Sequence, residues 1–152
     1  MAKNKLLFST PRGGVVLRPG TSKLLTGKHN HHDDCDHDHH HHHDHHGHHD
    51  HDRHGRRGID VREFETIRVV ADNRPISVSC VFLVLIITDK HGRFLGILDK
   101  IKLAPGQSCS RPYRVPGEFL EIKAIAAFRS RHKGRFWRRG VDVIDVAVFG
   151  HK

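Results

Sequence analysis

Histidine and aspartate dominate one stretch of this chain, residues 29–54, and that stretch limits how the rest can fold. It holds 15 of the chain's 18 histidines, together with seven aspartates and one cysteine. It has no aliphatic or aromatic side chain apart from imidazole, so it cannot contribute to a hydrophobic core. Its longest histidine run, residues 39–43, lies inside the chain between two aspartates, which argues against a purification tag. A core must therefore be built from the residues on either side.

The composition of this tract predicts metal binding. Imidazole nitrogen and carboxylate oxygen are ligands for Zn²⁺, Ni²⁺, Cu²⁺ and Co²⁺, and ordinary folding does not require them at this density. Because the histidines are closely and irregularly spaced, they offer many overlapping sites, and we expect several ions per chain. The aspartates can ligate directly, or they can orient a histidine by accepting its second ring N–H. A solvated spacer is the alternative. The candidate ligands are His29, His31, His32, Asp33, Asp34, Cys35, Asp36, His37, Asp38, His39, His40, His41, His42, His43, Asp44, His45, His46, His48, His49, Asp50, His51, Asp52 and His54.

Protonation of the tract predicts a pH response. Residues 29–58 carry a net charge of −4 with neutral histidines, which would approach +11 if all fifteen were protonated. Cys35 lies among aspartates, an environment that disfavours a reactive thiolate. It remains open whether Cys35 is a metal ligand, a disulfide partner or a residue without a role.

Charge divides the chain into three parts. Residues 1–28 carry six basic and no acidic side chains, residues 29–58 are acidic, and residues 59–152 carry 17 basic and 10 acidic side chains. This pattern favours attraction between subunits as much as nucleic-acid binding. No signal peptide is evident, because the apolar run 6–8 ends at Pro11. The most apolar stretch, residues 78–87, is too short to span a bilayer, so we expect no membrane span.

From Ile59 onward the pattern is that of β-strands separated by turns. Apolar runs predict strands at residues 63–71, 76–88, 94–103, 108–115, 119–128 and 141–149. Turns are predicted at 72–75, 89–92, 104–107 and 116–117. Pro112 predicts an edge strand. The fold class is therefore all-β, with an antiparallel β-sandwich or jelly roll over residues 59–152.

Two expectations concern individual strands of this domain. The strand at 76–88 is apolar on both faces over its second half, which predicts that both faces are buried there. Cys80 is expected to be an inert core side chain, and Cys109, in a short edge strand, the more accessible thiol.

Residues 1–28 are expected to form a basic arm that lies outside this domain. The arm has two short strand-like pieces, at 6–8 and 15–17, without an evident partner in the chain. We therefore expect it to add a strand to the sheet edge of another subunit. The residues expected to act in assembly are Leu6, Leu7, Phe8, Val15, Val16 and Leu17 of the arm, together with Arg135, Trp137, Arg138 and Arg139.

The last four of these residues belong to a basic loop at 129–140. It carries six arginine and lysine side chains around Phe136 and Trp137, a composition that suits phosphate contact and base stacking. The competing interpretation is contact with the acidic tract of a neighbouring subunit, with Trp137 as an interface anchor. We expect the second, since the rest of the domain has no RNP-like motif. Nucleic acid is therefore an unlikely partner.

No catalytic set is evident in the sequence. There is no G-x-S-x-G motif or phosphate-binding loop, and no nucleophile lies beside a credible base. His91, His132 and His151 are isolated, and His91 reads as a solvated turn residue. We therefore expect a protein that is not an enzyme.

A cysteine-bearing N-terminal connector followed by a small jelly-roll domain resembles the self-assembling subunits of bacterial endospore appendages. The matching domain would be residues 61–149, with Pro105-Gly106 and Pro116-Gly117 at its turns. The resemblance implies fibres at the cell or spore surface, in which the connector docks on the next subunit. It also implies an intersubunit disulfide from Cys35 to Cys80 or Cys109. This chain lacks the paired connector cysteines of that family, and metal bridging would take the place of covalent bridging.

These observations together predict a structural subunit of an extracellular or surface filament that carries a metal-binding tract. One alternative is a soluble, cytoplasmic protein that stores or delivers nickel, zinc or copper. Another is a polyanion-binding or nucleic-acid-binding protein that uses the basic loop. The first hypothesis alone explains the arm, the tract and the domain. The sequence does not name the metal, because the affinity order favours Cu²⁺ whatever the biological ion is.

Overall fold

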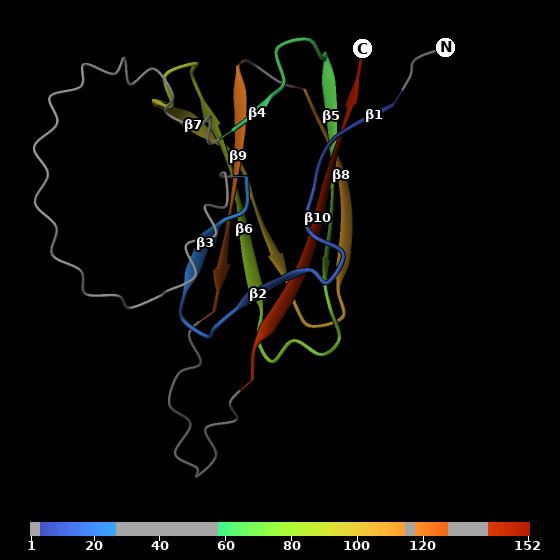
Figure 1. Cartoon of the computed structure of the whole chain (residues 1–152), viewed down its shortest axis with the longest axis vertical. Helices are drawn as coiled ribbons and strands as arrows, with labels where there is room; N and C mark the ends of the chain where they lie inside the picture. The colour runs from blue at the N-terminus through green and yellow to red at the C-terminus, as the bar shows by residue number, and fades with distance from the viewer. Residues whose placement is uncertain (1–3, 27–57, 115–117, 128–139) are drawn as a thin grey trace, which may run out of the picture.

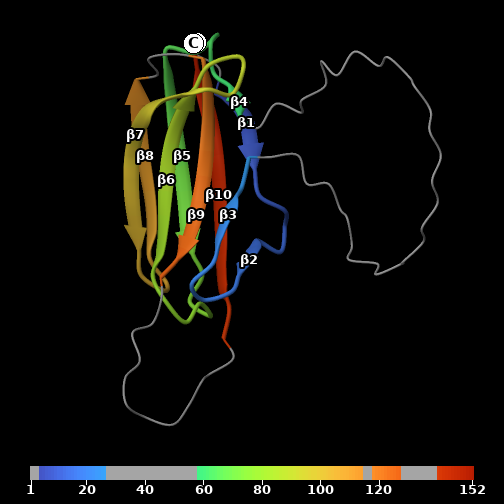
Figure 2. The same cartoon turned by 90° about the vertical axis from the view of Figure 1, so that its left-hand side faces the viewer.

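The computed structural model describes residues 4–26, 58–114, 118–127 and 140–152. In these residues the chain forms strands and no helix, and the strands build two antiparallel sheets that pack face to face (Figures 1 and 2). The strands are β1 (Lys5–Ser9), β2 (Val15–Leu17), β3 (Ser22–Leu24), β4 (Ile59–Asp60), β5 (Thr66–Asn73), β6 (Val81–Thr88), β7 (Phe94–Leu103), β8 (Ser108–Arg114), β9 (Phe119–Ala126) and β10 (Asp142–His151). The predicted all-β, antiparallel sandwich is confirmed.

The two sheets share one plan, with long central strands and shorter strands along one edge. Sheet A has the order β1-β10-β5-β8, and β2 also pairs with β10. Sheet B has the order β3-β9-β6-β7, and β4 also pairs with β9. The chain crosses from one sheet to the other after β2, β4, β5, β7, β8 and β9, so most strand pairings join segments that are distant in sequence. The exception is the hairpin of β6 and β7, which turns at residues 89–92 as predicted.

The core lies between the sheets and is built from one face of each central strand. In β6 the side chains of Val81, Leu83, Leu85 and Ile87 are buried, and those between them are only partly buried. The prediction that β6 is buried on both faces is therefore wrong for the single chain. Burying the inward apolar side chains of the central strands is the main source of stability for such a sandwich.

The observed strand bounds agree with the predicted ones to within two residues, except at the starts of β5 and β6. The strand predicted at 63–71 is β5, Thr66–Asn73, which therefore includes the first half of the turn predicted at 72–75. The strand at Phe94–Leu103 has the predicted limits, and β8, which contains Pro112, is an edge strand as expected. However, β6 begins at Val81, because residues 74–80 form a turn in which Ile76 is 72% exposed. Ser77 and Ser79 are the buried side chains of this turn. The apolar alternation of residues 76–80 therefore does not mark a strand.

The N-terminal residues are part of the sandwich and are not a free arm. Strands β1 and β2 both pair with β10, with Leu6 opposite Phe149 and Val15 opposite Ile144. Val15 and Leu17 lie in the core, Leu7 and Phe8 pack against it, and Leu6 and Val16 are each 53% exposed. The prediction that these assembly residues lack a partner inside the chain is wrong. Their partner is the last strand, which no local pattern could indicate.

The cysteines of the described residues do not lie as expected relative to the core. Cys109 of β8 packs against the core, whereas Cys80 lies just before β6 and is half-buried outside the core cluster. Both are free thiols. Both are partly buried, and the side chain of Cys109 points to the inner face, opposite buried Ala71. Cys35 lies outside the described residues.

Candidate functional site

The His/Asp tract leaves the sandwich from β3 and returns to it at β4. Both strands pair with β9, antiparallel to it and along the edge opposite β6. Residues 27–57 lie outside the described part of the chain, and so do all the ligands predicted at 29–54. What the structure describes is the place where the tract is attached.

The register shows that β3 and β4 occupy one continuous edge. Leu24 is opposite Lys123, and the N–H of Leu25 donates to the carbonyl oxygen of Ile122 at 2.8 Å. Ile59 is opposite Leu120. Only Glu121 lies between Ile122, which accepts from Leu25, and Leu120, which is opposite Ile59. The hydroxyl oxygen of Thr26 accepts from the N–H of Ile122 at 3.3 Å. The segment between Thr26 and Ile59 therefore leaves and rejoins one edge of β9 at nearby positions.

Buried side chains hold both ends of this insertion. Leu25, next to the point of departure, is 1% exposed, and Val61, after the point of return, is fully buried. The N–H of Val61 donates to the carbonyl oxygen of Glu118 at 3.2 Å. The guanidinium of Arg62 lies 5.1 Å from the ring centroid of Phe119 and forms a salt bridge with Asp60 at 2.7 Å. The segment is thus anchored to the core at each end.

The described residues offer no group of ligands for a metal ion. Among residues 4–26, 58–114, 118–127 and 140–152, no group of three His, Cys, Asp or Glu side chains is placed to hold an ion. His91 is exposed in the β6–β7 turn, as predicted. The neighbouring Asp89 accepts hydrogen bonds from the backbone N–H groups of Arg93 and His91, and these bonds lower the pKa of Asp89. Asp89 therefore stabilises a turn.

The basic loop also lies outside the described residues, with Arg135, Trp137, Arg138 and Arg139 among it. Its flanking residues are Ala127, whose N–H donates to the carbonyl oxygen of Cys80 at 2.9 Å, and Gly140. The loop thus connects β9 of one sheet to β10 of the other.

In the described part of the chain, no helix has the length and hydrophobicity to cross a membrane.

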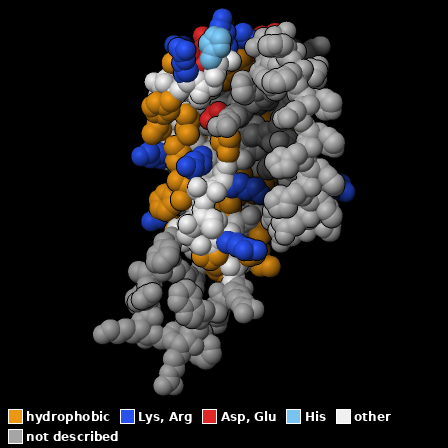
Figure 3. All heavy atoms as spheres, turned by 60° about the vertical axis from the view of Figure 1, so that its left-hand side comes forward, with side chains coloured by type: hydrophobic (Ala, Val, Ile, Leu, Met, Phe, Trp, Pro, Cys, Tyr) orange, Lys and Arg blue, Asp and Glu red, His pale blue; other side chains and the backbone are white. Residues whose placement is uncertain are grey.

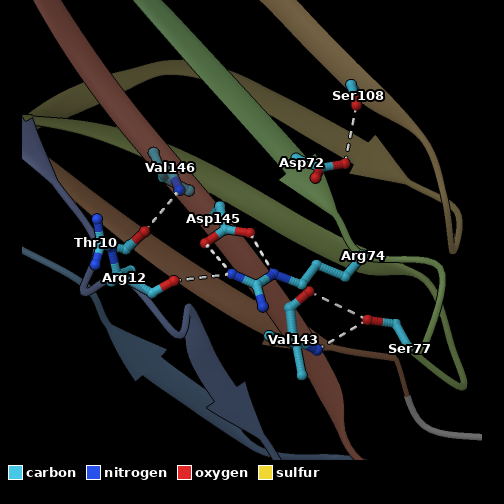
Figure 4. A network of polar contacts seen from close by, with 9 residues as sticks. All are labelled: Thr10, Arg12, Asp72, Arg74, Ser77, Ser108, Val143, Asp145 and Val146. Carbon is cyan, nitrogen blue, oxygen red and sulfur yellow. Dashed lines mark hydrogen bonds and ion pairs between the residues drawn. The ribbon is translucent and has the colours of Figure 1, made fainter.

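An ion pair that the sequence did not indicate holds the turn between β1 and β2 (Figure 4). Arg74 donates from Nε to Asp145 at 2.6 Å and from a terminal nitrogen to the same carboxylate at 3.0 Å and to the carbonyl oxygen of Arg12 at 3.2 Å. Thr10 continues the pairing with Val146 through its N–H and its hydroxyl oxygen. A bidentate pair of this geometry gives orientation as well as stability.

A separate polar cluster surrounds Asp142, at the start of β10, which is fully buried. The carboxylate of Asp142 accepts hydrogen bonds from the N–H groups of Val78 and Ser79, at 2.9 and 2.8 Å, and from the Ser79 hydroxyl at 2.5 Å. Asn73 donates its side-chain N–H groups to the carbonyl oxygens of Ser79 and Leu103. These bonds close the turn at 74–80 against both sheets. Their role is structural, because every contact is made within the scaffold.

A third cluster joins the free edges of the two sheets. The hydroxyl of Tyr113, in β8 of sheet A, donates to Asp99 of β7 at 2.6 Å, and Arg111 donates to the same oxygen at 3.1 Å. The hydrogen bond from Tyr113 is the main cause of the lowered pKa of Asp99. Burial, followed by the hydrogen bond to Asp99, raises the pKa of Tyr113.

We expect Tyr113→Phe to lower the free energy of unfolding by about 1 kcal/mol at pH 7, the usual effect of losing one such hydrogen bond. Because the folded pKa of Asp99 is depressed, its stabilisation is present above about pH 4 and is lost as pH falls through the folded pKa. Because the folded pKa of Tyr113 is raised, its stabilisation is complete below about pH 10 and declines as pH rises further.

Urea unfolding at pH 3, 7 and 10.5 measures both effects. The wild type should lose more stability than Tyr113→Phe on going from pH 7 to either extreme. The control is Ser108→Ala, which lies in β8 like Tyr113 and removes an exposed hydrogen bond to Asp72 of β5. This variant should leave the pH profile unchanged. Equal pH profiles for wild type and Tyr113→Phe would contradict the assignment.

Comparison of the chain with models of protein families, with curated proteins and with solved structures found no match.

Proposed function

We propose that this chain is a transition-metal-binding protein in which a β-sandwich holds a histidine- and aspartate-rich segment by both of its ends. The observation that carries the proposal is the density of ligands in residues 29–54, with 15 imidazoles and seven carboxylates. No other requirement of folding or solubility accounts for this choice of side chains. The ions taken up are divalent transition ions, several for each chain.

The attachment of the segment supports this function. Because Leu25 bonds to Ile122 and Ile59 is opposite Leu120, two residues apart on β9, both ends of the segment are held close to each other. A loop closed in this way keeps its ligands at a high effective concentration for one another. We infer that the scaffold does not depend on the segment, since β3 and β4 each pair with β9 on their own. Metal uptake and folding are thus separable.

Assembly through residues 6–17 is not part of the proposal. That interpretation required strands without a partner, and β1 and β2 pair with β10 in the same chain.

Excision of residues 27–58, with Thr26 joined directly to Ile59, tests the proposal. The register predicts that this variant keeps its sandwich, with a β-sheet circular dichroism spectrum and a cooperative melting transition. Calorimetry with Zn²⁺ and Ni²⁺ at pH 7.5 should show several ions per chain for the intact protein and fewer than one for the excised protein. A matched control replaces residues 29–54 by a glycine- and serine-rich segment of equal length.

The control variant should bind as little metal as the excised one. If the intact protein takes up no metal at pH 7.5, the segment is a spacer and the proposal is wrong. If the excised and intact proteins bind equally, the metal site belongs to the sandwich.

A further inference from the structure

The outer face of sheet B is unusually apolar for a surface in contact with water. Strand β6 is central in this sheet, and its outward side chains, Phe82, Val84 and Ile86, are all apolar and only partly buried. On the neighbouring β7, Ile97 is 49% and Phe94 is 64% exposed. Figure 3 shows hydrophobic side chains gathered over this side of the molecule, with basic side chains between them. A face of this kind marks an interaction surface.

Charged side chains border the apolar stripe at defined positions. On the outer face, Val84 lies between Lys123 of β9 and Lys100 of β7. Two residues further along β6, Ile86 lies between Glu121 of β9 and Ile97 of β7. Two residues before Val84 in β6, Phe82 is opposite Lys102 of β7, whose ammonium lies 5.8 Å from the centroid of the Phe82 ring. In β9, therefore, an acidic and a basic side chain lie on the same face two residues apart. Such a pair is complementary to itself when the strand direction is reversed.

We propose that this face binds a second copy of the chain, with sheet B packed against sheet B about a two-fold axis that crosses β6 between Val84 and Ile86. The axis lies midway between the two facing sheets B and runs perpendicular to their strands. It places Val84 of each copy over Ile86 of the other. It also places Lys123 of each copy over Glu121 of the other, so two opposite-charge pairs flank the apolar centre.

Charge selects this axis over its neighbours. A two-fold axis centred on Val84 would bring Lys123 onto Lys123 and Lys100 onto Lys100, which is unfavourable between desolvated charges. A two-fold axis along the strands would bring Lys100 onto Lys123. The proposed arrangement instead sets Lys100 over Ile97 and Lys102 over Phe94 of the second copy, where the aliphatic stems of the lysines cover apolar surface. The residues from which this contact is argued all lie outside residues 27–57.

Sedimentation equilibrium of the full-length protein in the presence of EDTA tests this surface, because the chelator removes any association that metal produces. We expect a reversible monomer–dimer equilibrium. Val84→Lys should weaken dimerisation by about tenfold or more, the effect of a central interface residue. The matched control is Val70→Lys, in the central strand β5 of sheet A, where Val70 is also partly buried and faces outward. It should not change the equilibrium.

Two further variants keep the test decisive if Val84→Lys does not fold. Phe94→Lys alters a side chain that is 64% exposed, so it should weaken the dimer without affecting the melting temperature. Lys123→Glu should weaken the dimer by setting glutamate over glutamate, and adding Glu121→Lys to it should restore the dimer. A monomer up to about millimolar concentration, dimers insensitive to these changes, or a double variant no stronger than the single one would overturn the proposal.

Discussion

A chain that begins at Gly58 is expected to lose cooperative folding. Such a truncation removes β1, β2 and β3, and with them the core side chains of Val15, Leu17 and Leu25. Burial of three such side chains contributes about 4 to 9 kcal/mol, which is comparable to the whole stability of a small domain. The truncation also exposes one edge each of β10 and β9. We expect a broad or absent melting transition and aggregation at concentrations where the full chain stays dispersed.

The excised variant, with Thr26 joined to Ile59, is the matched control for this truncation. It lacks residues 27–58 but keeps every described strand, so it should melt cooperatively. Differential scanning calorimetry of the two proteins side by side makes the comparison. If the chain beginning at Gly58 melted like the excised variant, the N-terminal strands would be dispensable and their pairing with β10 and β9 would be of little energetic importance.

Metal uptake by the full chain should collapse between about pH 7 and pH 5. Protons and metal ions compete for the same imidazole nitrogens, whose unperturbed pKa is about 6.5. Carboxylates stay ionised over this range, since their unperturbed pKa values lie near 4. The neutral fraction of such an imidazole falls about 25-fold from pH 7 to pH 5, so the affinity of a site falls by about that factor for each coordinating histidine, while binding by aspartate alone would persist. Titration of Zn²⁺ or Ni²⁺ at several pH values follows the loss.

Replacement of His37 and residues 39–43 by asparagine should lower the number of bound ions in steps, because many overlapping sites remain. Mg²⁺ should compete poorly, since it prefers oxygen ligands. A single site destroyed by one histidine substitution would mean a preorganised centre. Uptake that is unchanged at pH 5 would assign the ions to the aspartates.

The sequence predicts the fold best where local chemistry decides the structure. The strand 94–103 and the turn at 89–92 follow from alternation, and from a turn carboxylate, Asp89, that binds its own backbone. Pro112 marks an edge because proline has no backbone N–H to donate, so it is tolerated where that position faces away from the sheet. The error at residues 76–80 has a tertiary cause. Their apolar alternation imitates a strand, but Asp142, more than sixty residues away, binds this backbone and imposes a turn.

The candidate site was predictable in composition and not in placement. The density of imidazole and carboxylate groups identifies residues 29–54 without any structure. Nothing in the sequence indicates that Leu25 and Val61 flank one point of an edge strand, because that follows from pairing with β9. The expectation that residues 6–17 lack a partner within the chain failed for the same reason, since β10 is their partner. The sequence shows that the outer face of β6 is apolar, but it does not show that the side chains of this face are only partly buried.

The pairing of β1 and β2 with β10 has a consequence for synthesis. While the chain leaves the ribosome, residues 5–17 emerge early and have no partner strand until residues 142–151 have followed. At about 5–20 residues per second, the nascent chain carries these unpaired strands for several seconds. Sheet A therefore closes only after synthesis of this region ends. Unpaired strands of this kind favour aggregation, so we expect aggregation during synthesis to compete with folding until β10 has been made.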